Sequence, residues 1–202
     1  MQIRPLDIAG AFEVTPVPWD DSRGTFLEWY RFDRLEEVAG RKVDLRQANL
    51  SVSKRGVVRG IHYADTPPGQ AKYVTVPKGA IIDYVVDIRL GSPTYGRWDS
   101  VRLDDTDRKA LFLEEGLGHA FVALEEDTVV SYLVTGVYDP AHEHGLSPLD
   151  PEIALDLPAD LGELVLSDKD RDAPTLAQAR EQGLLPDHAA LRAVLTSQAG
   201  TS

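Results

Sequence analysis

The sequence contains no cysteine and is short of positive charge. Without cysteine, the chain cannot supply a disulfide, a thiolate nucleophile, a zinc ribbon or the ligands of an iron–sulfur cluster. Among its 202 residues, 21 are Lys or Arg and 33 are Asp or Glu, which gives a formal net charge of −12 at pH 7. A nucleic-acid-binding protein needs a positive surface, so this charge argues against one.

Long hydrophobic runs are also missing from the sequence. No window approaches the ~18 consecutive apolar residues of a membrane-spanning helix. The first residues, MQIRPLDI, lack the basic start and the apolar core of a signal peptide,. We therefore expect a cytoplasmic protein that does not contact a membrane. The sequence likewise shows no G-x-G-x-x-G turn opening a helix, no Walker A loop and no G-x-S-x-G elbow,.

What the sequence does contain is a series of short β-like segments, which we expect to form one domain over residues 1–202,. Apolar and β-branched runs recur about every 8–12 residues in the middle of the chain without intervening helices, and this spacing predicts an antiparallel sandwich or barrel. The predicted strands cover residues 8–16, 25–30, 47–53, 57–63, 71–76, 81–89, 98–103, 110–113, 119–123 and 128–137, and a last extended piece covers 164–170. Short helices are predicted over 31–39, 175–180 and 188–196, and residues 143–158 are expected to wrap around the surface,.

Three charged or basic side chains, Arg59, His62 and Lys72, lie inside the two apolar runs 57–63 and 71–76. We expect these runs to pair as neighbouring strands. An unpaired buried charge costs several kcal/mol or more, so such groups must find partners or face a cavity. Each alone is compatible with a rim salt bridge or a satisfied core histidine, but together they indicate a cationic site that contains a base.

The strand 57–63 poses a geometric problem, because Arg59 and His62 are three residues apart. Strict alternation would send their side chains to opposite faces of the sheet. Gly60 between them suggests a β-bulge that re-aims one of the two.

Four residues are the candidates for chemistry. His62 is the candidate general base, because the pKa of an unperturbed histidine lies near neutrality, and Asp170 is a candidate to orient it. Lys72 provides a fixed positive charge where an oxyanion would develop. Tyr132 lies in an apolar strand and has a hydroxyl that needs a partner. Two alternatives remain open. Tyr132 could instead be a core tyrosine bonded to the backbone, and Asp170 could be a solvated turn residue.

An acidic protein that binds an anion must gather its few cations locally, against its overall field. The candidates are Arg23, Arg59, Lys72 and Lys169, which would form an anion site if they converge. A metal site is the alternative, built from His142, Glu143 and His144 together with His62 and His119,. No H-x-H on a strand is paired with a distant Glu and His in the usual metal-cupin spacing, so we favour a site without metal.

Seven ordered motifs resemble the dTDP-4-dehydrorhamnose 3,5-epimerase (RmlC) family, which includes related epimerases of antibiotic-sugar pathways. The resemblance covers about residues 3–185. The motifs are D-S-R-G-x-F-x-E-W (21–29), Q-A-N-L-S-V-S (47–53), R-G-I-H-Y (59–63), P-P-G-Q-A-K-Y-V (67–74), V-V-D-I-R-x-G-S-P-T-Y-G-R-W (85–98), G-L-G-H-A-F (116–121) and L-S-D-K-D (166–170).

This resemblance implies an all-β, cupin-type jelly roll that forms a homodimer by exchanging N-terminal strands and uses no metal or organic cofactor. His62 would remove a proton next to the C4 ketone of a dTDP-sugar, with Asp170 as its partner, Lys72 would stabilise the enolate oxygen, and Tyr132 would return a proton at C5 from the opposite face. The positions that match the family's nucleotide- and sugar-binding residues are Arg23, Glu28, Gln47, Asn49, Arg59, His119, Tyr138, Glu143 and Lys169.

The sequence thus predicts a deoxysugar-pathway isomerase that inverts C3 and C5 of dTDP-4-dehydro-6-deoxy-glucose. An enzyme that inverts only C3, or only C5, is the main alternative. A metal-dependent cupin enzyme and a non-catalytic sugar-nucleotide binding protein are the alternatives from other classes.

Overall fold

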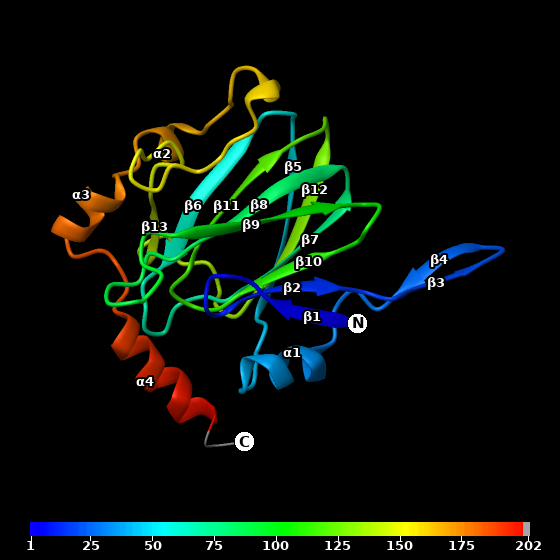
Figure 1. Ribbon diagram of the computed structural model, residues 1–202, viewed down its shortest axis with the longest axis horizontal. Coiled ribbons are helices and arrows are strands. Elements are labelled where there is room, and N and C mark those ends of the chain that lie inside the picture. Colours follow the sequence, from blue (N-terminus) through cyan, green and yellow to red (C-terminus); the bar gives the residue numbers. More distant parts are fainter. Residues whose placement is uncertain (200–202) are drawn as a thin grey trace.

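The computed structural model describes residues 1–199 and consists mainly of two antiparallel β-sheets that face each other (Figure 1). The six-stranded sheet has the order β1–β2–β10–β7–β12–β5, and the five-stranded sheet has the order β13–β6–β11–β8–β9. A two-stranded hairpin, β3–β4, projects away from both sheets (Figure 1). This arrangement is the cupin-type jelly roll that the sequence predicts.

The strand bounds follow the predicted segments closely in the middle of the chain. The six-stranded sheet contains β1 Gln2–Pro5, β2 Ala11–Thr15, β10 Ala110–Leu113, β7 Lys72–Lys78, β12 Thr128–Val134 and β5 Gln47–Ser53. The five-stranded sheet contains β13 Glu143–Gly145, β6 Val58–Ala64, β11 Gly118–Ala123, β8 Ala80–Val86 and β9 Trp98–Asp104. The hairpin is formed by β3 Pro18–Asp21 and β4 Gly24–Leu27.

The main core lies between the two sheets and follows from the alternation of side chains along each strand. Val74 and Val76 of β7 point into it from one sheet, and Ile81 and Val85 of β8 point into it from the other. Burying each such side chain contributes about 1.5–3 kcal/mol. A second core, which includes Tyr84 and Val86 of β8, covers the opposite face of the five-stranded sheet with the C-terminal segment.

The predicted pairing of the segments 57–63 and 71–76 is wrong. Strand β6 pairs with β11 and β13, whereas β7 pairs with β10 and β12. The connection that contains Pro67, Pro68 and Gly69 therefore carries the chain from one sheet to the other. As a result, Arg59 and His62 face Lys72 across the interior instead of standing beside it on one sheet.

The bulge predicted at Gly60 is confirmed. His62 pairs with His119 and Arg59 pairs with Phe121, so three steps along β6 match two steps along β11. Gly60 has a φ of 111°, and a Cβ there would lie 2.4 Å from the carbonyl oxygen of His119. Only glycine fits this position, and the extra residue turns Arg59 and His62 toward the same side.

The helices lie outside the sheets (Figure 1). Their bounds are α1 Phe32–Ala39, η1 Ala159–Leu161, α2 Asp168–Arg171, α3 Leu176–Glu181 and α4 His188–Ala199. The prediction of α1 is confirmed, since Gly40 ends it in the left-handed conformation,. Helix α3 begins after Thr175, whose side chain and that of Gln178 form a capping box,.

Several predicted boundaries differ from the structure. The extended piece predicted over 164–170 is wrong at its end, because Asp168–Arg171 is the helical turn α2. The surface segment predicted over 143–158 begins with a strand, β13, that the sequence prediction missed, as it missed β1. Strand β12 stops at Val134, and the strand predicted over 25–30 stops at Leu27. Across residues 1–199, no helix has both the length and the apolar character needed to cross a membrane.

Candidate active site

A cavity of about 690 Å³ opens between the two sheets at the end where β6, β7 and β12 meet β13 and α2. Ten of the thirteen site residues predicted from the sequence line it: Gln47, Asn49, Arg59, His62, Lys72, Tyr132, Tyr138, Glu143, Lys169 and Asp170. They come from segments up to 123 positions apart in the sequence, which the jelly roll brings to one place. The cavity also holds three of the four predicted cations, so positive charge is concentrated here in an acidic protein.

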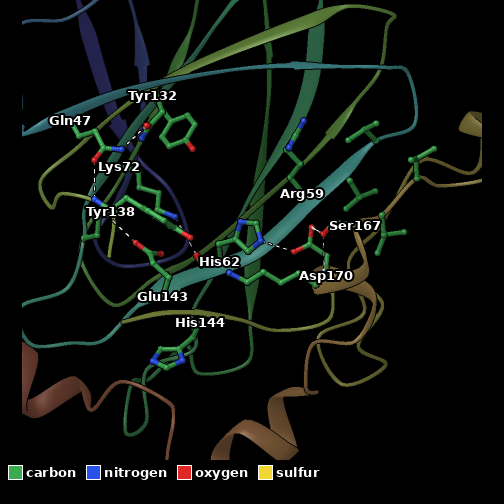
Figure 2. A pocket seen from close by; sticks show the side chains of 17 residues that line it. Gln47, Arg59, His62, Lys72, Tyr132, Tyr138, Glu143, His144, Ser167 and Asp170 are labelled. Atoms are coloured by element: carbon green, nitrogen blue, oxygen red, sulfur yellow. Dashed lines mark hydrogen bonds and ion pairs between the residues drawn. The ribbon is translucent and has the colours of Figure 1, made fainter. Parts of the chain in front are cut away.

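His62 and Asp170 form a short polar contact on one wall of the cavity (Figure 2). His62 Nε2 lies 2.6 Å from Asp170 Oδ1, and Ser167 Oγ donates a hydrogen bond of 2.9 Å to Asp170 Oδ2. Burial works to raise the pKa of Asp170, but the hydrogen bonds from His62 and Ser167 outweigh it and lower that pKa. An ionised carboxylate only accepts hydrogen bonds, so we assign the proton to Nε2. The other ring nitrogen of His62 has no hydrogen-bond partner among residues 1–199 and can act as a base,.

Lys72 enters the same cavity from the opposite sheet. Its side chain is buried, and Nζ lies 3.5 Å from the backbone carbonyl oxygen of His62. Burial lowers the pKa of Lys72, and the negative charges of Glu143 and Asp83 oppose that effect. The common hollow for an imidazole and an ammonium group, which the sequence hypothesis requires, is present (Figure 2).

Tyr132 stands on β12, in the sheet opposite His62, and its ring packs against the main core. Burial raises the pKa of its phenol, an effect that the positive charge of Arg59 opposes and the negative charge of Glu143 reinforces. The phenol is therefore protonated at neutral pH and can act as an acid. Figure 2 shows Tyr132 and His62 on different sides of the cavity.

The remaining polar groups are fixed by hydrogen bonds among themselves. Gln47 Nε2 donates to Asn49 Oδ1 at 2.7 Å, and Gln47 Oε1 accepts from the backbone N–H of Tyr138 at 2.9 Å. Gln70 Nε2 contacts Glu143 Oε1 at 3.4 Å. The Arg59 guanidinium donates to Ser53 Oγ at 3.1 Å, which holds it at the rim. These residues form a polar, preorganised lining for a small anionic ligand.

The arrangement suits one kind of chemistry. A histidine oriented by a carboxylate can take a proton from carbon, and a nearby ammonium group can stabilise the oxyanion that results. A protonated phenol from the opposite wall can return a proton to the other face. Arginine and a second lysine at the rim suit a phosphate-bearing substrate.

Comparison with known proteins identifies the family. The family model described as dTDP-4-dehydrorhamnose 3,5-epimerase matches residues 5–178. The chain belongs to the dTDP-4-dehydrorhamnose 3,5-epimerase family. It is 56% identical over 194 residues to the dTDP-4-dehydrorhamnose 3-epimerase of Streptomyces niveus, covering 96% of this chain and 93% of that protein.

Two further relatives place the chain among both kinds of epimerase in this family. The dTDP-4-dehydrorhamnose 3,5-epimerase of Mycolicibacterium smegmatis is 53% identical, covering 92% of this chain and 91% of that protein. The crystal structure of ChmJ, a 3'-monoepimerase from Streptomyces bikiniensis in complex with dTDP-quinovose, superposes with a TM-score of 0.93 at 45% identity, covering 96% of this chain and 98% of that one. The protein is thus an epimerase with the fold of this family.

Three predicted site residues of the epimerase do not line its cavity. Arg23 lies at the turn of the β3–β4 hairpin, where it pairs with Asp21 at 2.6 Å and its side chain is 87% exposed. Glu28 follows the same hairpin and pairs with Arg31 at 3.1 Å. His119 is buried behind the cavity, where its Nε2 lies 2.6 Å from Asp83 Oδ1.

The sequence reasoning also missed residues that the epimerase brings to the cavity. Besides the predicted set, the lining contains Val57, Val58, Gln70, Val165, Leu166 and Ser167, and also His144, which the sequence analysis considered only as a metal ligand. Ser167 is the N-cap of α2 and also accepts from the backbone N–H of Asp170 at 3.1 Å. The pattern Ser167-Asp168-Lys169-Asp170 is the capping signature S-x-x-D, and it could have predicted this helical turn.

The histidines considered for a metal site take other partners in the epimerase. His142 Nδ1 and His144 Nε2 contact the two oxygens of Asp65 at 2.9 and 2.5 Å. Within residues 1–199, no group of three or more His, Asp or Glu side chains is arranged to hold a metal ion. That the epimerase works without a cofactor stays a prediction.

Proposed function

We propose that this epimerase inverts both C3 and C5 of dTDP-4-dehydro-6-deoxy-glucose. The observation that carries this proposal is the single cavity in which the His62–Asp170 pair and Lys72 meet, with the Tyr132 phenol on the opposite sheet. Relatives at 45–56% identity carry epimerase names for closely related dTDP-sugars, and ChmJ was crystallised with dTDP-quinovose.

In the proposed reaction, His62 removes a proton from a carbon next to the C4 ketone. The electron pair moves onto the ketone oxygen, and the Lys72 ammonium group stabilises the enolate that forms. Asp170 stabilises the imidazolium through its short contact with His62. At C5, Tyr132 then donates a proton from the opposite face, and at C3 a proton from solvent enters from that face, so each configuration inverts and the ketone returns.

The polar rim would hold the rest of the substrate. Arg59 and Lys169 bind the diphosphate, since arginine is the side chain best suited to phosphate oxygens. The ring of Tyr138, 57% exposed at the mouth of the cavity, packs against the thymidine or the sugar. The amides of Gln47 and Asn49, together with Glu143, bind the remaining polar groups.

Arg23 and Glu28 would act across a homodimer, in which the N-terminal strands are exchanged. The hairpin that carries Arg23 projects from the body, and its Trp19 and Phe26 are 51% and 68% exposed. The outward face of β5 adds Leu50 and Val52, which are 65% and 55% exposed. Apolar surface of this extent favours a contact with a second copy, which would bring Arg23 to the partner's cavity.

Inversion at C3 alone is the second candidate, because two of the relatives above are named as a 3-epimerase and a 3'-monoepimerase. The presence of Tyr132 does not decide between the two, since a small change in cavity shape can suppress one inversion. We also expect the reaction to take place in the cytoplasm.

Incubation with dTDP-4-dehydro-6-deoxy-glucose in D₂O, followed by NMR, tests the proposal. We expect deuterium at C3 and at C5 and a product inverted at both centres. Deuterium and inversion at C3 alone would support the second candidate. Binding of dTDP without any exchange of substrate hydrogen would contradict both.

A further inference from the structure

Lys72 holds a positive charge in an unfavourable place. The residue is only 6% exposed, and within the described residues the one hydrogen bond of its Nζ is to the His62 carbonyl oxygen, at 3.5 Å. Burial lowers the pKa of such a lysine,. A neutral amine has no charge with which to stabilise an enolate, so a nearby negative charge must keep the proton on Lys72.

Asp83 provides a buried carboxylate on the inner face of β8. It is 0% exposed, and its neighbours on that face, Ile81 and Val85, belong to the main core. Asp83 Oδ1 lies 2.6 Å from His119 Nε2, whereas Oδ2 is buried without a hydrogen-bond partner among residues 1–199. A buried carboxylate oxygen without a hydrogen-bond partner is stabilised by a positive charge nearby.

The alternation of the strands turns Lys72, Asp83 and His119 toward the same interior. Lys72 and Asp83 do not form a direct ion pair in the part of the chain that the structure describes, so their charges act through space. That attraction is several times stronger in a protein interior than in water. Burial raises the pKa of Asp83 above its ordinary value, and the hydrogen bond and charge of His119, together with the charge of Lys72, limit this rise by favouring the ionised carboxylate.

We propose that Asp83, held in place by His119, is a positioning residue that keeps the Lys72 ammonium group charged. The proposal rests on the proposed function of Lys72, and Asp83 acts through Lys72 without touching the substrate. The contact between His119 Nε2 and Asp83 Oδ1 fixes the position of the carboxylate. Because Lys72 and Asp83 do not form a direct ion pair in the described residues, the N–H groups of Lys72 remain available to the enolate.

Other titratable groups surround Lys72 and set its proton affinity together with Asp83. They are His62 and Arg59 on β6, His119 on β11, Tyr132 on β12, Glu143 on β13 and Asp170 on α2. Glu143 also favours the charged form of Lys72, but it borders the open cavity, where water and salt screen its charge,. Asp83 is fully buried, so its charge is not screened in this way.

Two measurements on Asp83→Asn test the proposal. Competitive labelling of lysines with acetic anhydride reports the pKa of Lys72 without any substrate, and we expect it to fall by about one unit or more. Lys72 must be protonated to act, so activity is lost as pH rises through its pKa. The high-pH limb of the kcat profile for deuterium exchange therefore moves to lower pH by the same amount, while the affinity for dTDP is unchanged.

Asp150→Asn is the matched control. Asp150 is also buried, at 2% exposure, but it accepts hydrogen bonds from backbone N–H groups of Glu152, Ile153 and Leu176. We expect this variant to lose stability and to keep the wild-type Lys72 pKa and pH profile. An equal shift in Asp150→Asn would overturn the proposal, because any loss of stability would then explain the effect.

His119→Phe provides a second variant in case Asp83→Asn does not fold. Without the hydrogen bond from His119, Asp83 is easier to protonate, so the pKa of Lys72 falls in the same direction but by less. A wild-type Lys72 pKa in both variants would overturn the proposal. A lowered Lys72 pKa with an unchanged pH profile would support the Asp83–Lys72 coupling and contradict the proposed role of Lys72 in the reaction.

Discussion

At the scale of single residues, the site depends on groups whose surroundings set their protonation. Asp170 is kept ionised by its hydrogen bonds, and the Tyr132 phenol is kept protonated by burial. In the proposed reaction, the proton acceptor is His62 and the proton donor is Tyr132, and the two stand on different sheets. Inversion requires an acceptor and a donor on opposite faces of the sugar.

Removal of the Tyr132 hydroxyl tests the donor. In Tyr132→Phe we expect inversion at C5 to fall by about 10²-fold or more, because general acids contribute effects of this size. Deuterium uptake at C3 persists, since His62 and Lys72 are intact. NMR of the product in D₂O measures both.

Tyr63→Phe is the control for that substitution. Tyr63 adjoins His62 on β6 but packs in the second core, on the opposite face of the sheet. Its hydroxyl is buried without a hydrogen-bond partner in the described residues, so its loss leaves both rates unchanged. Equal losses at C3 and C5 in Tyr132→Phe would contradict the assigned role.

Most residues that line the cavity were predictable from the sequence, but the contacts among the buried polar groups were not. His62 and Lys72 could be selected because charged or basic groups are unusual in apolar strands. Asp170 could be selected because it lies in the short acidic motif S-D-K-D. The pairing of His119 with Asp83 could not be predicted, since it depends on the register between β11 and β8. Ser167 was predictable from its capping pattern and was missed.

At the scale of elements, the site is organised by the bulge in β6. The extra residue at Gly60 lets Arg59 and His62 face one cavity, although they are three positions apart. The glycine and the odd spacing predicted the bulge. The pairing of β6 with β7 was predicted wrongly, because a short loop with two prolines fits a hairpin as well as a crossing between sheets.

A methyl group at position 60 is expected to disturb both stability and the site. In Gly60→Ala the new Cβ would lie 2.4 Å from the His119 carbonyl oxygen, so the strands must separate. We expect the free energy of unfolding to fall by about 1–3 kcal/mol more than in Gly91→Ala. Urea unfolding of both variants measures the difference.

Gly91→Ala is a suitable reference because Gly91 also has a positive φ, of 81°, but its Cβ would meet open space. Gly91→Ala therefore has the strain of a positive φ but no steric clash at its Cβ. Equal destabilisation of the two variants would show that close packing at Gly60 does not hold the bulge.

At the scale of the whole molecule, one chain supplies most of the cavity but leaves Arg23 on a projecting hairpin. An antiparallel sandwich or barrel was predictable from the recurrence of short strands, and the jelly roll was implied by the family resemblance. The proposed contact of the hairpin with a second copy of the chain comes from the family resemblance and stays a prediction. That residues 1–202 form one domain stays a prediction.

Mixing two inactive variants tests the exchange of hairpins. Arg23→Ala retains its own His62, and His62→Ala retains its own Arg23, so a mixed dimer contains one complete site. After subunit exchange, we expect about a quarter of wild-type activity, since half of the dimers are mixed and each has one working site. If Arg23 served its own chain, each site of the mixed dimer would lack one residue and activity would not recover.

The most direct test of the central claim is deuterium exchange in His62→Ala. The claim is that His62, in a cavity shared with Lys72, removes the proton next to the C4 ketone. We predict that His62→Ala still binds dTDP but takes up no deuterium at C3 or C5 above the rate without enzyme. Exchange at the wild-type rate in this variant would contradict the account.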